Sequence, residues 1–422
     1  TLAPAAAAAR AASLALSGPA GGVVGARLVG EAVALRDLLT LDMGGTSADA
    51  SLVAGGVALT EGAETVAGIP LALPAILIET VSAGGGSIAA LDEGGALKVG
   101  PRSAGANPGP ACYGRGGWEP TVTDACLVLG WLDPATPLAD DVRLDRVAAE
   151  GALARLGEPR GMAAGIAQVA TAVMARALKR VSVARGIDPR GIALLPFGGA
   201  GPLFGCALAD ALGMSRVVIP PHPGVLSALG LAAAPERVEL LASCHQSLST
   251  LDAAALARAY RPVLEAAAAA IPEPGATLTR FADCRFVGQG YEVTVPAPAD
   301  DPAALAAAFR QAHDARYGHA DSDQPVELVN LRVTAERAVR APRLGGEAGA
   351  RAGVGKPTPG RREIVTRDGQ SRRAAVWPLG ELPPGLELEG PAVLAGPDAT
   401  GLIEPGWRGR VHACGAVIVE RR

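Results

Sequence analysis

The segment Leu38–Ser51, LLTLDMGGTSADAS, constrains the fold more than any other part of the chain. An apolar run ends at Asp42, two adjacent glycines follow, and the next run carries a second acid at Asp49. This order predicts a strand, a tight glycine turn and a second strand. Gly44 and Gly45 allow a ligand to approach the backbone closely, with N–H groups directed at it.

The polar side chains of this segment suit a nucleotide phosphate. Thr46 and Ser47 add hydroxyl donors beside the glycines, and Asp42 stands at the strand end, where a carboxylate can hold Mg²⁺ or a water. A hairpin turn that simply contains a glycine pair explains this segment alone nearly as well. The rest of the chain has to decide between the two interpretations.

Glycine-rich motifs recur along the chain in a fixed order, and several long motifs in one order are specific. On these motifs the chain resembles the hydantoinase A and 5-oxoprolinase family, which also includes subunits of acetone and acetophenone carboxylases. The resemblance runs from Ser17 nearly to the C-terminus. The motifs are SGPAGGVVGA (Ser17–Ala26), LDMGGTSAD, SAGGGSIA (Ser82–Ala89), GPRSAGANPGPACYGRGG (Gly100–Gly117), TVTDACLVLG (Thr121–Gly130) and LPFGGAGPLFG (Leu195–Gly205).

Composition excludes several classes of protein. The 422 residues are 49% hydrophobic, enough for two or three domains with cores of their own. A net charge of -4 and only 3% aromatic residues argue against nucleic acid. Six scattered cysteines without a CxxC pair fit free thiols in a reducing cytoplasm, and Cys112 is interpreted as a buried, inert thiol. No apolar run reaches ~20 residues without Gly, Pro or charge, so no membrane span is predicted.

The resemblance implies an α/β architecture in three parts. Residues 1–240 would form a ribonuclease-H-like ATPase lobe of the actin, Hsp70 and sugar-kinase type. Residues 241–340 would form a small α/β module, and residues 361–422 a β-rich C-terminal module, with a Gly/Arg/Pro linker over 345–360. Helical spacing and breakers predict helices over 5–16, 23–33, 145–156, 163–185, 203–212, 226–233, 253–270 and 302–317.

The resemblance also assigns roles to residues of the nucleotide site. The turn after Asp42 would hold phosphate, with Asp42 or Asp49 holding Mg²⁺ directly or through water. The strand, glycine loop and helix around residue 198 would close over adenosine. The triple glycine at 84–86 marks a place where backbone passes close to a phosphate or to another strand. The cofactor-binding residues expected on these grounds are Gly44, Gly45, Thr46, Ser47, Gly84, Gly85, Gly86, Gly198, Gly199, Ala200 and Gly201.

Other candidate site residues have competing structural interpretations. Arg102 and Arg115 lie in a long glycine- and proline-rich loop and suit a carboxylate, bicarbonate or phosphate, although each alone also fits a surface ion pair. Asp124 is interpreted as a helix cap rather than a metal ligand. The glycines of SGPAGG suggest either a turn that binds an anion at a helix N-terminus or a close-packed helix entry. His222 is a further candidate beside prolines.

In the resembling family ATP lies between two related lobes, and each lobe carries an Asp-x-Gly-Gly-Thr turn. This chain has one such turn, which by resemblance is the second, and nothing before it matches the first. We therefore expect the first lobe to lie on missing sequence, from a truncated gene or in a separate chain. We also expect this chain alone to hydrolyse no ATP.

The family chemistry is ATP-dependent activation of a carbonyl, which favours two enzyme functions. One is hydrolysis of a cyclic amide such as hydantoin or 5-oxoproline, and the other is ketone carboxylation with bicarbonate. A third hypothesis is a nucleotide-switch module of chaperone type. The resemblance implies ATP and Mg²⁺ as cofactors, a cyclic amide or ketone as substrate, a hydantoinase B-type partner subunit and an oligomer. No GxSxG elbow or Walker motif is present.

Overall fold

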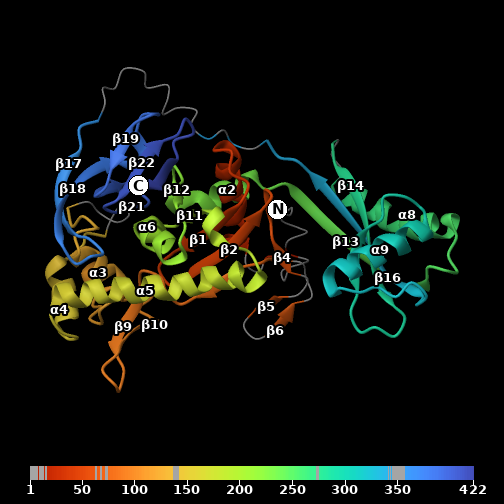
Figure 1. Ribbon diagram of the computed structural model, residues 1–422, viewed down its shortest axis with the longest axis horizontal. Coiled ribbons are helices and arrows are strands. Elements are labelled where there is room, and N and C mark those ends of the chain that lie inside the picture. The colour runs from red at the N-terminus through yellow and green to blue at the C-terminus, as the bar shows by residue number, and fades with distance from the viewer. Residues whose placement is uncertain are drawn as a thin grey trace. The chain divides into compact units, whose positions relative to one another are not determined.

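The computed structural model describes residues 17–61, 64–66, 69–71, 75–135, 142–271, 275–340 and 357–422, together with residues 8, 14, 342 and 344. The chain divides into two compact units (Figure 1). The small unit contains Ala234–Ala341 with Thr1–Ala11, and the large unit contains Ala12–Ala233 and Pro342–Arg422. The helix expected over 5–16 and the linker expected over 345–360 lie largely outside the described residues.

The large unit is built on a mixed sheet of nine strands in the described part of the chain. Inside it, β1 (Leu38–Met43) is parallel to β11 (Ala193–Phe197) and antiparallel to β2 (Ala48–Ala54). The strand, turn and strand expected over 38–51 are therefore confirmed. The order is β19-β22-β23-β12-β11-β1-β2-β3, with β8 also paired to β2. The other strands are β3 (Val57–Ala58), β8 (Glu79–Val81), β12 (Arg216–Ile219), β19 (Glu387–Glu389), β22 (Trp407–Val411) and β23 (Val417–Arg421).

Helices cover both faces of this sheet at its centre, which explains why β1 and β11 are almost continuously apolar and buried. Successive residues of β1 alternate between two cores: Leu39 and Leu41 face one core, and Leu38 faces the other. The first core includes α5 (Pro159–Val181) and α6 (Gly201–Leu212), and the second includes α2 (Ser17–Ala32) and α7 (Leu226–Ala233). In Figure 1 the yellow-green helix α5 runs below β1 and β2.

The glycines of SGPAGGVVGA serve helix packing rather than a turn. The motif lies inside α2, which starts at Ser17, so the expected glycine turn and the anion site ahead of a helix at residue 23 are wrong. A Cβ on Gly21 would lie 2.7 Å from the carbonyl oxygen of Ser227 in α7, and one on Gly230 of α7 would lie 1.8 Å from the carbonyl oxygen of Gly21. Because no side chain intervenes, the two helix backbones touch.

A pair of glycine substitutions tests this backbone contact. We expect Gly230→Ala to lower the free energy of unfolding by about 2–3 kcal/mol, because its methyl group meets backbone that cannot rotate away. Gly151→Ala in α4 (Arg146–Ala154) is the control, since nothing lies within 4 Å of its Cβ, and it should stabilise by about 0.5–1 kcal/mol. Urea unfolding of both variants measures the difference, and equal stabilities would contradict the contact.

The last part of the chain contributes to the main sheet. β23 pairs antiparallel with β12, with Val217 opposite Val419, so residues near the C-terminus lie inside the large unit. The expected C-terminal module over 361–422 is thus continuous with this sheet. A second sheet of mixed direction has the order β17-β18-β20-β21. Its strands are β17 (Gly360–Val365), β18 (Ser371–Pro378), β20 (Ala392–Ala395) and β21 (Thr400–Ile403).

Three two-stranded sheets complete the described strands of the large unit. After Gly55-Gly56, β3 pairs antiparallel with β2 at the edge of the main sheet. A hairpin turn lies at Glu93-Gly94-Gly95, where Gly95 N–H donates to Asp92 C=O over 2.8 Å. The pairs are β9 (Ser87–Leu91) with β10 (Leu97–Ser103), β4 (Thr60–Glu61) with β7 (Ala75–Ile76), and β5 (Glu64–Val66) with β6 (Ile69–Leu71).

The small unit is an antiparallel sheet of order β13-β16-β14-β15 with two helices. The helices α8 (Ala253–Ala270) and α9 (Pro302–Tyr317) have the predicted bounds. The loop after β14 contacts α9, because Gln289 Nε2 lies 3.0 Å from the Nε2 of buried His313. The strands are β13 (Glu236–Ser247), β14 (Thr277–Phe286), β15 (Val293–Pro296) and β16 (Val326–Arg337).

One helical stretch among the described residues, Pro159–Arg185, is long and apolar enough to cross a membrane by those two criteria alone. It contains α5, whose buried residues Ile166, Ala170 and Met174 recur at helical spacing and join the core of the large unit. Packing in this core therefore accounts for its apolar character.

Candidate functional site

The turn between β1 and β2 is tight and open to solvent. Gly44 N–H donates to Ser47 C=O over 3.1 Å, which closes the turn. Gly44, Gly45 and Thr46 are exposed, and no atom lies within 4 Å of a Cβ built on either glycine. Among the described residues, no hydrogen bond uses the N–H of Gly45 or Thr46. Unpaired N–H groups on an exposed glycine turn fit an anion such as phosphate.

The triple glycine lies directly against this turn. Gly85 N–H donates to Gly44 C=O over 2.9 Å, and Gly86 N–H donates to Gly45 C=O over 2.6 Å. A Cβ on Gly84 would lie 2.5 Å from the carbonyl carbon of Thr46. The glycines at 84–86 therefore admit the backbone of the turn, and their contact with a phosphate stays a prediction.

Two carboxylates stand side by side at the base of the turn. Asp42 and Asp49 are direct partners across β1 and β2. Burial raises the pKa of Asp42 to about 6, and the negative charge of nearby Asp49 also raises it. A hydrogen bond from Ser227 Oγ (3.2 Å) acts in the opposite direction and lowers this pKa. Burial also raises the pKa of Asp49, while Thr80 Oγ1 donates to its Oδ1 over 2.6 Å.

Oxygen ligands of this kind fit Mg²⁺, which is commonly held by one or two carboxylates plus phosphate and water. A bound cation would also relieve the repulsion between Asp42 and Asp49. In the described part of the chain no cluster of three or more His, Cys, Asp or Glu residues could hold a metal by itself. The carboxylate pair therefore suits a metal that arrives with phosphate better than a closed protein cage.

The glycine loop before α6 reaches the same place. Gly198 has a φ of +76°, and a Cβ there would lie 2.4 Å from Oδ1 of Asp42. Ala200 N–H donates to Met43 C=O over 3.3 Å, and α6 begins at Gly201. The structure thus brings the predicted glycines of both segments together at Asp42.

Two residues of this site were not predicted from the sequence. Ser227 at the start of α7 contacts Asp42, and Asp398 accepts a hydrogen bond from Gly224 N–H over 3.0 Å. Thr400 N–H donates to Gly199 C=O over 3.3 Å, so residues 398–400 buttress the loop before α6. A serine opening a helix is a signal available in the sequence. No sequence signal joins residues 398–400 to a loop two hundred residues earlier.

Asp124 organises the long loop that precedes it. Its fully buried carboxylate accepts from the N–H groups of Cys112 (2.7 Å) and Thr121 (2.9 Å) and from the Thr121 hydroxyl. With Thr121 it forms the capping box of α3 (Val122–Val128), so the predicted capping role is confirmed. Thr123 Oγ1 donates to Gly85 C=O over 2.9 Å, which ties this helix start to the triple glycine.

The remaining sequence candidates are three residues of the loop over 100–117 and His222. Arg102 and Arg115 are exposed, and Arg102 forms an ion pair with Glu119. Cys112 is fully buried, and burial raises the pKa of its thiol far above the usual range, in agreement with an inert thiol. His222 is exposed and its side chain caps nothing, while the adjacent Pro223 C=O accepts from Gly198 N–H. Substrate roles for the two arginines stay predictions.

The same substitution at two caps separates the loop-organising role of Asp124 from ordinary capping. We expect Asp124→Asn to lower the free energy of unfolding by about 2–4 kcal/mol, because the amide donates where three donors already converge in a buried site. Asp145→Asn, at the exposed N-cap of α4, is the control and should change it by less than about 0.5 kcal/mol. Urea unfolding without Mg²⁺ measures both free energies. Equal losses of stability in the two variants would contradict the loop-organising role of Asp124.

Together, the fold and the site define an α/β protein with an exposed glycine turn, whose N–H groups fit an anion, and a carboxylate pair at one strand end. The model of the hydantoinase/oxoprolinase family matches residues 1–239, and the chain belongs to this family. This confirms the resemblance found in the sequence.

Relatives and solved structures are similar over nearly the whole chain. Caprolactamase subunit alpha of Pseudomonas jessenii is 34% identical over 93% of this chain and 59% of its own. The 5-oxoprolinase of yeast (Saccharomyces cerevisiae) is 30% identical over 92% of this chain and 32% of its own length. An acetone carboxylase structure without nucleotide superposes with a TM-score of 0.82 at 25% identity, over 96% of this chain and 61% of that one. The structure of the Pseudomonas jessenii caprolactamase superposes with a TM-score of 0.75 at 32% identity, over 96% of this chain and 61% of that one. The chain thus spans about 60% or less of these proteins.

Proposed function

We propose that the chain binds ATP with Mg²⁺ and forms part of an ATP-dependent enzyme that hydrolyses a cyclic amide. The observation that carries this proposal is the exposed turn at Gly44–Ser47, with its unpaired N–H groups beside Asp42 and Asp49. The names of relatives, an ATP-dependent caprolactamase and 5-oxoprolinases, support the amide substrate. The fold would be the ribonuclease-H-like lobe of an ATPase, with the loop over 198–201 against adenosine.

Phosphorylation of the amide carbonyl oxygen would drive the hydrolysis. The amide carbonyl is a poor electrophile, and phosphoryl transfer to its oxygen creates a good leaving group for the attack that follows. Such a transfer needs positioning and charge neutralisation more than a reactive side chain. The N–H groups of Gly45 and Thr46 would orient phosphate, and the carboxylates of Asp42 and Asp49 would hold Mg²⁺. Arg102 and Arg115 would contact the substrate or the transferred phosphate.

The active assembly would contain more than this chain. Relatives named as subunits, such as caprolactamase subunit alpha, support a partner subunit of hydantoinase B type in an oligomer. A second lobe would complete the nucleotide cleft, either on further sequence of the same protein or on another chain. We place this assembly in the cytoplasm.

Ketone carboxylation is the second candidate function. The specific observation in its favour is structural: the acetone carboxylase structure superposes with the higher TM-score, 0.82 against 0.75 for caprolactamase. Sequence identity favours caprolactamase instead, at 32% against 25%. Both reactions would use the same phosphate turn, so the substrate distinguishes them.

Substrate-stimulated phosphate release tests the choice between the two functions. The chain, co-expressed with its flanking sequence and any neighbouring B-type subunit, is assayed with ATP and Mg²⁺. We expect caprolactam, 5-oxoproline or hydantoin to stimulate release without bicarbonate, because the amide oxygen accepts the phosphoryl group. Stimulation only by acetone with bicarbonate would replace the amidase by a carboxylase, and stimulation by none of them would contradict both functions and favour a nucleotide switch.

A glycine pair tests the phosphate turn itself. We expect Gly84→Ala to reduce ATP-dependent phosphate release at least 100-fold, because its methyl group would displace the backbone of Thr46. Gly94→Ala in the hairpin between β9 and β10 is the control, since the nearest atom to its Cβ is Asp92 Oδ1 at 3.4 Å. Full activity of the Gly84 variant would sink the proposal that this turn positions phosphate.

A further inference from the structure

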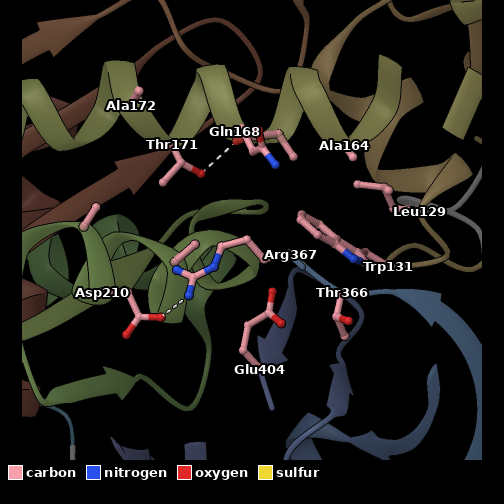
Figure 2. Close-up of a pocket in the computed structure, with 13 residues that line it drawn as sticks. Leu129, Trp131, Ala164, Gln168, Thr171, Ala172, Asp210, Thr366, Arg367 and Glu404 are labelled. Atoms are coloured by element: carbon pink, nitrogen blue, oxygen red, sulfur yellow. Dashed lines mark hydrogen bonds and ion pairs between the residues drawn. The ribbon is translucent and has the colours of Figure 1, made fainter. Parts of the chain in front are cut away.

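A cavity of about 440 Å³ lies in the large unit, away from the phosphate turn. It is lined by α5, by the C-terminal half of α6, by the residues after α3, by the turn between β17 and β18 and by Glu404 after β21 (Figure 2). Asp210 on its wall lies nine residues after Gly201, which is about 13 Å along α6 from the glycine loop. The cavity is therefore separate from the proposed nucleotide site.

The wall of the cavity near α3 is apolar and rigid. Trp131 is 4% exposed, donates its indole N–H to Val365 C=O over 2.8 Å and packs edge-on against Phe204. Ala167 of α5 and Ala207 of α6 line the same space, and the side chain of each is only a methyl group. Small residues opposite an anchored tryptophan leave room for a flat apolar body.

The opposite end of the cavity holds a buried carboxylate. Glu404 is 5% exposed and points into the cavity between Arg367 and Thr366 (Figure 2). Burial raises the pKa of Glu404 to about 7, against the opposing effect of Arg367, while Asp368 and Asp210 raise it further. Arg367 is engaged by Asp210, which also lies 3.2 Å from Arg421 Nη1.

The buried charges at this end are negative, and the positive ones are partly in water. The side chains of Arg367 and Arg421 are 44% and 55% exposed, against 12% for Asp210. Solvent screens the two arginines, so they compensate a buried carboxylate poorly. The backbone N–H of Arg367 also donates to Glu404, and a cationic ligand group in the cavity would add a charge partner beside this carboxylate that solvent does not screen.

The hydroxyl groups of the lining favour a cation over an anion. Thr171 donates its proton to Ala167 C=O over 2.8 Å, and Thr366 donates to Asp368 Oδ1 over 2.6 Å. These protons are therefore committed within the protein. Arg367, which also lines the cavity, is paired with Asp210, so Glu404 is the carboxylate there that a ligand cation can pair with.

We propose that this cavity binds a small organic cation, whose flat apolar body lies against Trp131 and whose protonated amine or amidine pairs with Glu404. This cation site is independent of the proposed function, because it does not require ATP binding or the activity of any relative.

Tryptamine, an indole with a protonated amine, tests the proposal by calorimetric titration of the chain. We expect a dissociation constant below about 1 mM and no measurable binding of indole-3-propionate, its anionic counterpart. Glu404→Gln should weaken tryptamine binding at least tenfold, because the amide carries no charge. The control Glu389→Gln changes an exposed glutamate that pairs with Arg408 and Arg422, and it should leave binding unchanged.

A pH series on the unmodified chain provides a test that needs no variant. The pKa of Glu404 near 7 means that the free carboxylate is ionised at pH 8 and mostly protonated at pH 6, while the amine stays charged at both. Tryptamine affinity should therefore fall about tenfold from pH 8 to pH 6. Binding that is independent of pH, equal in Glu404→Gln, or absent at pH 8 would overturn the proposal.

Discussion

The large unit depends on a contact between two segments of bare backbone, the turn at Gly44–Ser47 and the triple glycine at 84–86. Two N–H to C=O hydrogen bonds join them, and the space available to Gly84 admits no methyl group. This contact fixes one side of the turn, while the other side of the turn stays open to solvent. A rigid, exposed set of N–H groups is what phosphate recognition requires, because the donors are oriented before the ligand arrives.

The rest of the site is arranged around that contact by elements distant in sequence. The start of α3 contacts Gly85 through Thr123, the loop before α6 contacts Asp42 and Met43, and residues 398–400 support the same loop. Since β23 also joins the sheet beside β12, the end of the chain is part of the unit that carries the turn. A change near the C-terminus can thus reach the site through the sheet and this loop.

Much of this arrangement could be predicted from the sequence, because the glycine motifs and the apolar runs on both sides of the Asp42 turn are local signals. The helices over 226–233, 253–270 and 302–317 were predictable for the same reason. β13 was missed because its side chains are mostly exposed or half-buried, so no apolar period marks it. The start of α5 was placed at residue 163, although Glu158 and Pro159 are an N-cap and a first-turn proline.

Other features depend on tertiary contacts that no local pattern records. The glycines of α2 resemble a turn motif until α7 is seen to lie against them. The pairing of β23 with β12 and the contact of Asp398 with Gly224 join segments about two hundred residues apart. The sequence of Gly84–Gly86 does not reveal which backbone lies against them, and only the packing shows that it is the turn at Gly44–Ser47.

Phosphate binding by the N–H groups of Gly45 and Thr46 can be followed by amide NMR of the deuterated chain during a titration with ATP and Mg²⁺. We expect large shifts of the Gly45 and Thr46 amide signals and none for Gly55 and Gly56, at the far end of β2. Unchanged signals at Gly45 and Thr46 with saturating nucleotide, or shifts confined to other parts of the chain, would contradict it.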